Sequence, residues 1–216
     1  MSLAALEAKV GQPDQGSAPP LAPRRHDEPG GGPPEGPPGL LGDPARFGLV
    51  AFLGTVSMMF IGLTSAYLVR QVANDWRALP APRLLWWNTA ALLLSSLSLE
   101  GARRGWRRSD AEAAFRLLAA TGLLGIAFAA GQVQAWRILT AQGLTLASNP
   151  HSSFFYVLSG LHVVHLTGGL VWWAVALLRL RSLGPAPGGD PLRLLATYWH
   201  FLAALWLYLL YVLFVL

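Results

Sequence analysis

The sequence contains no cysteine, and only 12% of its 216 residues are charged. Without cysteine the chain forms no disulfide, no thiolate metal site and no cysteine nucleophile. So few charges do not cover the surface of a water-soluble globule of this length, because about a quarter of the residues of soluble domains are charged. With 53% hydrophobic residues, the composition therefore predicts a membrane protein.

Five apolar stretches, bounded by charged or Pro/Gly-rich breaks, are the candidate membrane spans. They cover about residues 47–69, 84–101, 117–136, 153–178 and 194–216. A helix of about 20 residues crosses roughly 30 Å of hydrocarbon. The stretches are longer than barrel strands and do not alternate with period two, so we expect helices. The apolar run of the second stretch ends at Leu99 and is short, so its helix also uses Gly101 and Ala102 to cross the bilayer, or the bilayer thins around it. The predicted fold class is all-α, an integral membrane bundle of five transmembrane helices over residues 47–216.

Residues 1–46 form a separate segment. They contain ten of the sixteen prolines and the run GGGPPEGPPG, with almost no aromatic or β-branched residues. Such a segment buries too little apolar surface to offset its ordering entropy. We expect a disordered Pro/Gly-rich tail that acts as a spacer, with a docking segment as the alternative.

The basic residues are unevenly divided between the two sides that five alternating spans define. One side receives twelve of the sixteen, namely Lys9, Arg24, Arg25, Arg46, Arg103, Arg104, Arg107, Arg108, Arg116, Arg179, Arg181 and Arg193. The other side receives only Arg70, Arg77, Arg83 and Arg137. Since basic residues near span ends favour the cytoplasm, we expect a cytoplasmic amino terminus and an outer carboxyl terminus. This topology explains the pI near 10.2, and no nucleic-acid partner is expected.

The loop ARRGWRRSD after the second span carries four of these arginines. It is interpreted as a topology signal, with anionic-lipid binding as the alternative. Glu100 lies three and four residues before Arg103 and Arg104. This spacing predicts an ion pair at the membrane interface.

Small residues mark two candidate helix-packing faces. In the first span the residues at spacing four are Gly54, Met58, Gly62 and Ala66. In the fourth span Gly168 and Gly169 follow His165 within one turn. Small residues let two membrane helices approach closely, so each face is predicted to meet another helix.

Three histidines, His162, His165 and His200, fall inside predicted spans. A membrane-embedded histidine ties helices together by hydrogen bonds, ligates a metal or haem, or transfers protons. No carboxylate lies near these residues in the sequence to complete a zinc site, and paired haem ligation needs imidazoles facing each other from different helices. The spacing alone leaves the three interpretations open. The glycine face beside His165 favours helix ties, whose hydrogen bonds would go to neighbouring spans.

Four sequence runs resemble subunit III of the haem–copper oxidases, and within that family the five-helix bacterial type of cytochrome c oxidase subunit III. They are FLGTVSMMFIGLTSAYLVR, WWNTAALLLSSLSLE, GQVQAWRILTAQGLTLASNPHSSFFYVLSGLHVVHLTGGLVWW and YWHFLAALWLYLLYV. The third run matches the family's long loop and its FY-x-L-x-G-x-H-x-x-H-x-x-GG helix, and the fourth its final YWHF…W helix. Order and spacing agree over about residues 47–216.

The resemblance implies a non-catalytic helical subunit of a respiratory terminal oxidase, of the cytochrome c type, in aerobic electron transport. Such a subunit stabilises subunit I, supports proton uptake and binds phospholipids, in a complex with subunits I and II in the bacterial cell membrane. It implies no catalytic, cofactor or metal residue in this chain, and haem and copper in partner subunits. The five histidines, one of them in the tail, are too few for two haems and a copper.

Three alternatives remain. In the first, the chain is the equivalent subunit of a quinol oxidase or of a nitric oxide reductase. In the second, it is a self-contained haem or metal membrane protein that uses His162, His165 and His200. A small transporter ranks last, because no internal repeat and no mid-span charge is apparent.

The sequence also departs from the family. Many members carry acids where Val56, Arg83 and Ala203 stand here. A proton-related role of those carboxylates is therefore not transferred to this chain. Some members have seven helices, and this chain resembles the last five, so a lipid cleft formed by the first two would need another chain.

Overall fold

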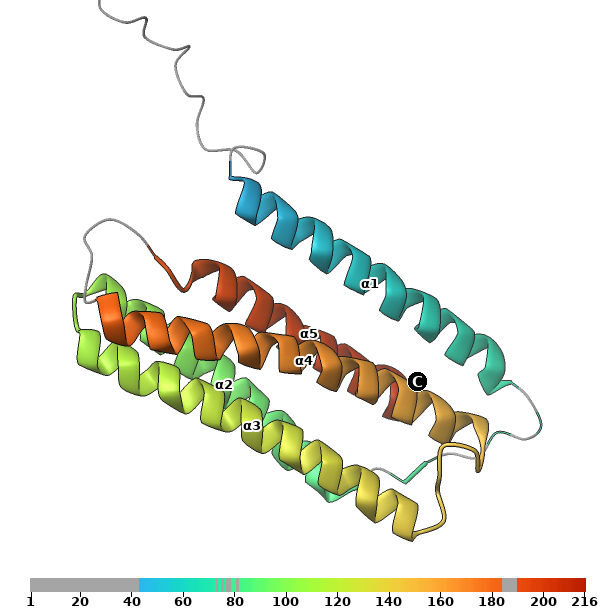
Figure 1. Cartoon of the computed structure of the whole chain (residues 1–216). Helices are drawn as coiled ribbons and strands as arrows, with labels where there is room; N and C mark the ends of the chain where they lie inside the picture. Colours follow the sequence, from blue (N-terminus) through green and yellow to red (C-terminus); the bar gives the residue numbers. More distant parts are fainter. Residues whose placement is uncertain (1–42, 73, 75, 77–78, 81, 184–189) are drawn as a thin grey trace, which may run out of the picture. The chain divides into compact units, whose positions relative to one another are not determined.

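The computed structural model describes residues 43–216 apart from residues 73, 75, 77, 78, 81 and 184–189. The predicted tail, up to residue 42, lies outside the described residues. The described residues form five α-helices and no strand (Figure 1). The helices are α1 (Pro44–Gln71), α2 (Arg83–Arg107), α3 (Ala111–Ala141), α4 (Pro150–Leu183) and α5 (Arg193–Phe214). The predicted all-α class is confirmed.

Four of the helices, α1, α3, α4 and α5, are long and apolar enough to cross a membrane. The remaining helix, α2, has 25 residues, and at a rise of about 1.5 Å per residue it is also long enough to cross a membrane. Its composition is more polar than that of the other four helices. Its polar residues Asn88, Thr89, Ser95 and Ser96 are buried. The chain is therefore an integral membrane helical bundle in which α2 turns a polar face inward.

The helices extend beyond most of the predicted spans. The tail was predicted to end at residue 46, but α1 begins at Pro44, because the Asp43 carboxylate accepts hydrogen bonds from the amides of Ala45 and Arg46. At the start of α3 the Asp110 carboxylate accepts from the Ala113 amide at 2.9 Å. Hydropathy marks the hydrocarbon crossing, whereas the capping carboxylates mark where α1 and α3 begin.

The helices α2, α3, α4 and α5 pack in a closed ring, each against the next and α5 against α2. The helix α1 packs against α4 and α5 (Figure 1). Along the α2–α5 contact, the indole of Trp199 donates to the Ser95 hydroxyl at 2.9 Å and the indole of Trp206 to the Thr89 hydroxyl at 3.0 Å. Because bulk water does not compete for them in the membrane interior, such bonds hold helices in register, at about 1 kcal/mol each.

Candidate functional site

His162 lies on α4 and is fully buried. Its ring packs edge-on against Phe128 of α3, with ring centroids 5.8 Å apart, and 5.2 Å from the ring of Trp206 of α5. Neither ring nitrogen has a hydrogen-bond partner among the described residues. This imidazole faces the inside of the α2–α5 ring.

His165, one turn further along α4, faces α1 instead. Its ring centroid lies 5.9 Å from that of Phe60 and 6.4 Å from that of Phe52. Its Nδ1 donates to the carbonyl oxygen of Leu161 at 2.7 Å, within its own helix. The sequence predicted side-chain hydrogen bonds to neighbouring spans, and this bond differs from that expectation.

The bond between α4 and α5 at this level comes from Tyr198, whose hydroxyl donates to the backbone carbonyl of His165 at 2.7 Å. A Cβ placed at Gly169 would lie 3.0 Å from the Tyr198 ring, and one at Gly168 would lie 3.7 Å from its hydroxyl. Because neither glycine has a side chain, the Tyr198 side chain packs directly against α4 at this point.

His200 lies on α5 and is half-buried. The rings of His162 and His165 face different helices, so the structure does not bring these three histidines to one point. Within the described residues no group of three or more histidines and carboxylates is placed to hold a metal ion.

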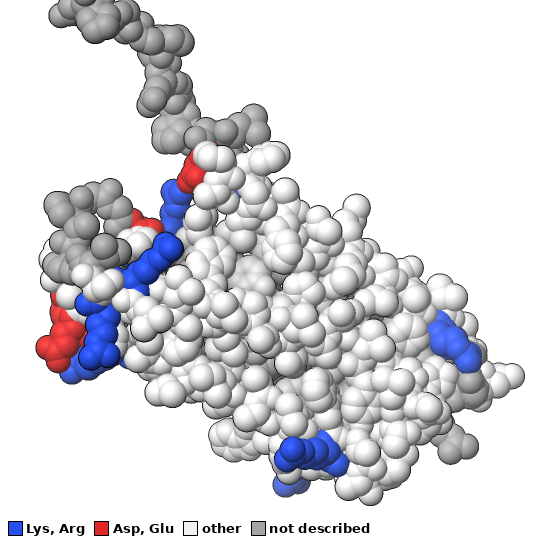
Figure 2. Space-filling view, viewed as in Figure 1, with Lys and Arg blue, Asp and Glu red and all other residues white. Residues whose placement is uncertain are grey.

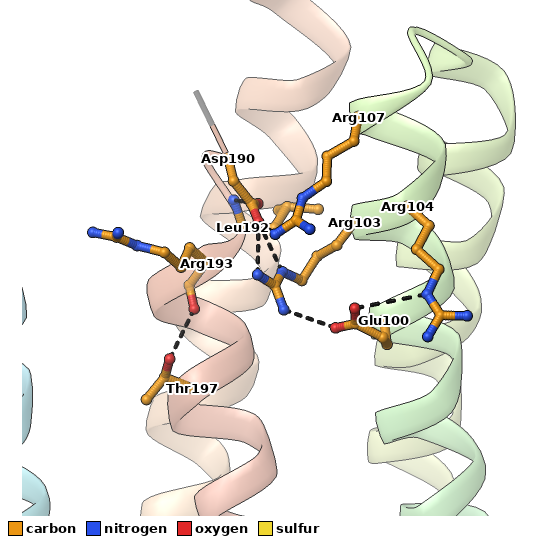
Figure 3. Close-up of polar contacts among 8 residues, drawn as sticks. All are labelled: Glu100, Arg103, Arg104, Arg107, Asp190, Leu192, Arg193 and Thr197. Atoms are coloured by element: carbon orange, nitrogen blue, oxygen red, sulfur yellow. Dashed lines mark hydrogen bonds and ion pairs between the residues drawn. The ribbon is translucent and has the colours of Figure 1, made fainter. Parts of the chain in front are cut away.

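The predicted ion pair belongs to a larger charged cluster between α2 and the start of α5 (Figure 3). Arg103 donates to Glu100 at 2.7 Å and to Asp190 from two nitrogens, at 3.0 and 2.7 Å. Arg107 donates to the same Asp190 oxygen at 2.9 Å. Arg104 lies 3.8 Å from Glu100. Arg103 thus joins two carboxylates that are far apart in the sequence.

Asp190 was not among the residues singled out from the sequence. Its other oxygen accepts from the Leu192 amide at 3.2 Å, which fixes the start of α5. Burial alone would raise the pKa of Asp190, but the hydrogen bonds from Arg103 and Arg107 outweigh it and hold the pKa below its ordinary value. A lone carboxylate immediately before a predicted span was the signal that could have found this residue.

His151, at the start of α4, is a second residue that sequence reasoning missed. Its Nδ1 accepts from the Leu79 amide at 3.0 Å, and its Nε2 donates to the carbonyl oxygen of Leu213 at 3.0 Å. The ring is therefore neutral with the proton on Nε2. It joins the α1–α2 connection, α4 and the end of α5.

An open cavity of about 1030 Å³ lies between the second half of α1 and the start of α4. Gly62, Ala66 and Val69 line its apolar side, and Arg70 and Asn149 are among its polar lining residues. A Cβ at Gly62 would meet nothing within 4 Å.

A Cβ at Gly54 would likewise meet nothing within 4 Å, and Met58, which lies between Gly54 and Gly62 on α1, is 73% exposed. The first small-residue face was predicted to meet another helix. Among the described residues no helix of this chain covers Gly54 or Gly62, because the buried residues of α1, such as Val56 and Phe60, lie on its other side.

The fold and these sites define a multi-helix integral membrane protein in which several buried polar side chains connect the helices of the chain. The family model for cytochrome c oxidase subunit III matches residues 42–216. The chain belongs to the cytochrome c oxidase subunit III family. It is a subunit III of a haem–copper oxidase of the respiratory chain and is part of a complex with other oxidase subunits.

Curated relatives agree with this assignment. Cytochrome c oxidase subunit 3 of Synechocystis sp. is 33% identical over 174 residues, which are 77% of this chain and 73% of the relative. The protein of the same name from Corynebacterium diphtheriae is 28% identical over 169 residues, 74% of this chain and 82% of the relative. Quinol oxidase subunit 3 of Bacillus spizizenii is 28% identical over 167 residues, 75% of this chain and 82% of the relative.

Proposed function

We propose that this chain is the non-catalytic subunit III of a cytochrome c-type oxidase, stabilising subunit I in a complex that also contains subunit II. The observation that carries the proposal is the face of α1 formed by Gly54, Met58 and Gly62, which the described helices of this chain leave uncovered. A surface of small residues at spacing four suits close contact with a helix of another chain. Haem and copper then belong to the partner subunits.

The test is recovery of the complex. Gly54→Leu, in the part of this face that does not line the cavity, is expected to lower co-purification of subunit I, because the side chain fills the space where the partner helix would approach. The matched control is Gly48→Leu, on the same helix and also without a neighbour within 4 Å, but outside the spacing-four series. Equal recovery of subunit I with both variants would contradict the proposed interface.

The electron donor is proposed to be cytochrome c, in line with the family and with two of the relatives named above. A quinol is the second candidate, favoured by the similarity to the quinol oxidase subunit of Bacillus spizizenii. Oxygen consumption by the purified complex with reduced cytochrome c, compared with a quinol, distinguishes the two donors.

A phospholipid is the proposed occupant of the cavity beside α1. Its lining joins apolar Val69 and Phe154 to polar Arg70 and Asn149, which suits an acyl chain and a headgroup. Ala66→Phe, which narrows the cavity, is expected to reduce the lipid that remains after mild delipidation. Mass spectrometry of the complex measures that loss, and unchanged retained lipid would count against this site.

The orientation proposed for the bacterial cell membrane has the amino terminus in the cytoplasm and the carboxyl terminus outside. Figure 2 shows most basic side chains gathered at one end of the helices, and Arg103, Arg107 and Arg193 lie where α2 ends and α5 begins. Basic residues favour the cytoplasmic side. A reporter fused after Leu216 is expected to respond as an outer-side reporter, and a cytoplasmic response would reverse the orientation.

A further inference from the structure

Three side chains inside the α2–α5 ring carry buried polar atoms without a partner among the described residues. They are Asn88 on α2, through Nδ2, Gln132 on α3, through Nε2 and Oε1, and His162 on α4, through both ring nitrogens. Asn88 is 5% exposed, and Gln132 and His162 are 0% exposed. Most buried polar groups in proteins are paired, so five unpaired atoms on three side chains require an explanation.

Gln132 and His162 face the same α3–α4 contact. One turn before Gln132, the Phe128 ring packs against His162 with centroids 5.8 Å apart. One turn after Gln132, the Trp136 indole donates to the hydroxyl of Ser159 at 3.0 Å, and Ser159 lies one turn before His162. Gln132 therefore lies between a residue that contacts the imidazole itself and a residue that contacts α4 one turn before it.

Asn88 reaches the same level from α2. A Cβ added at Gly131, the residue before Gln132, would overlap Oδ1 of Asn88. Thr89, the neighbour of Asn88, accepts the indole hydrogen bond of Trp206, whose ring lies 5.2 Å from that of His162. The three unpaired side chains thus belong to one layer, enclosed by aromatic rings.

The chemistry of the unpaired atoms selects the ligand. Asn88 Nδ2 and Gln132 Nε2 are donors, Gln132 Oε1 is an acceptor, and a neutral imidazole offers one donor and one acceptor. A metal ion would satisfy only the acceptors, and an anion only the donors. Water donates and accepts, and a buried water typically makes about three hydrogen bonds to otherwise unpaired groups.

We propose that Asn88, Gln132 and His162 bind sequestered water in the middle of the helix ring. The water supplies the partners that these side chains do not find in the chain, and connects α2, α3 and α4 at one level. The site is independent of the electron donor of the oxidase and of the contacts with subunit I.

Radiolytic labelling of the intact complex in H₂¹⁸O tests the proposal, because hydroxyl radicals formed from bound water label the residues beside it. The reporter is Trp206, and the reference is Trp199, an indole on the same helix that is equally buried and is likewise hydrogen-bonded to a hydroxyl of α2. Trp206 is expected to take up ¹⁸O well above Trp199. Equal labelling of the two indoles would overturn the proposal.

Gln132→Met, which keeps much of the side-chain volume and removes both polar atoms, is expected to lose the excess label at Trp206 and leave Trp199 unchanged. Persistence of the excess label in this variant would also overturn the site as described. Should the variant fail to assemble, an experimental map of the unmodified complex at a resolution that shows water decides the matter. Density within hydrogen-bond distance of a His162 nitrogen supports the site, and an empty layer refutes it.

Discussion

Trp76 stacks on His151, with ring centroids 4.9 Å apart and planes inclined by 11°. The indole comes from the α1–α2 connection and the imidazole from the first turn of α4, 75 positions further along the chain. Since the same imidazole bonds Leu79 and Leu213, one side chain holds three segments together at the predicted outer side of the membrane.

The first prediction concerns these hydrogen bonds. His151→Phe keeps an aromatic ring beside Trp76 but leaves the Leu79 amide and the Leu213 carbonyl without that partner. We expect the free energy of unfolding to fall by roughly 1–3 kcal/mol, measured as a lower thermal midpoint of the purified complex. Trp76→Phe, which keeps both hydrogen bonds, should lose less. A midpoint unchanged by His151→Phe would show that stacking alone holds this junction.

The second prediction is a pH dependence that arises from Asp190. Its pKa is lower in the folded chain than in the unfolded chain, so its stabilisation is fully present above about pH 4 and disappears as the pH falls through the folded-state value. Asp190→Asn is expected to lower stability by roughly 1–3 kcal/mol at neutral pH. This difference from the unmodified protein should shrink under acid conditions, as thermal midpoints measured across pH would show.

The control for that experiment is Glu112→Gln. Glu112 is paired with Arg116 at 3.7 Å, but both side chains are largely exposed, at 81% and 70%. Exposed pairs contribute little, so this variant should follow the unmodified protein at every pH. A constant difference between Asp190→Asn and the unmodified protein at all pH values would contradict the assigned role of the carboxylate.

The third prediction concerns the contact of α4 with α5. Gly169→Leu forces a side chain into the space of the Tyr198 ring, and the bond from Tyr198 to the His165 carbonyl is expected to break. Overpacking of this kind costs about 1–3 kcal/mol. Gly160→Leu, on the same helix but with nothing within 4 Å of its Cβ, should be close to neutral. Equal thermal midpoints for the two variants would mean that the helices separate without cost.

The fourth prediction separates two roles of Asp43. Its carboxylate caps α1 and also accepts from Arg193 of α5 at 2.9 Å. Asp43→Asn keeps a capping oxygen and loses the ion pair, which is half exposed and contributes about 0–1 kcal/mol. Asp43→Ala also loses the cap and should cost about 1 kcal/mol more. Thermal midpoints of the two variants measure the difference, and equal values would assign the whole effect to the ion pair.

The fifth prediction is that neither His162 nor His165 ligates a cofactor. His165→Leu removes a hydrogen bond and ring contacts with α1, at a cost of order 1 kcal/mol. The oxidase should lose activity sooner during turnover while its haem absorption spectrum stays the same. Stoichiometric haem, copper or zinc in the purified chain alone, lost in His162→Leu or His165→Leu, would instead establish a ligand site.

The sequence by itself determined the all-α membrane fold, the helix order and the family, because hydropathy, helix length and local motifs are written in consecutive residues. The close spacing of Glu100 with Arg103 and Arg104 likewise identified one end of the charged cluster. Only the tertiary structure decided that Arg103 also binds Asp190, 87 residues away, that His151 bonds both Leu79 and Leu213, and that the imidazoles of His162 and His165 face different helices. Such contacts depend on how the helices rotate and pack against one another, since a pattern in one helix states which face is polar or small but not which residue of another helix meets it.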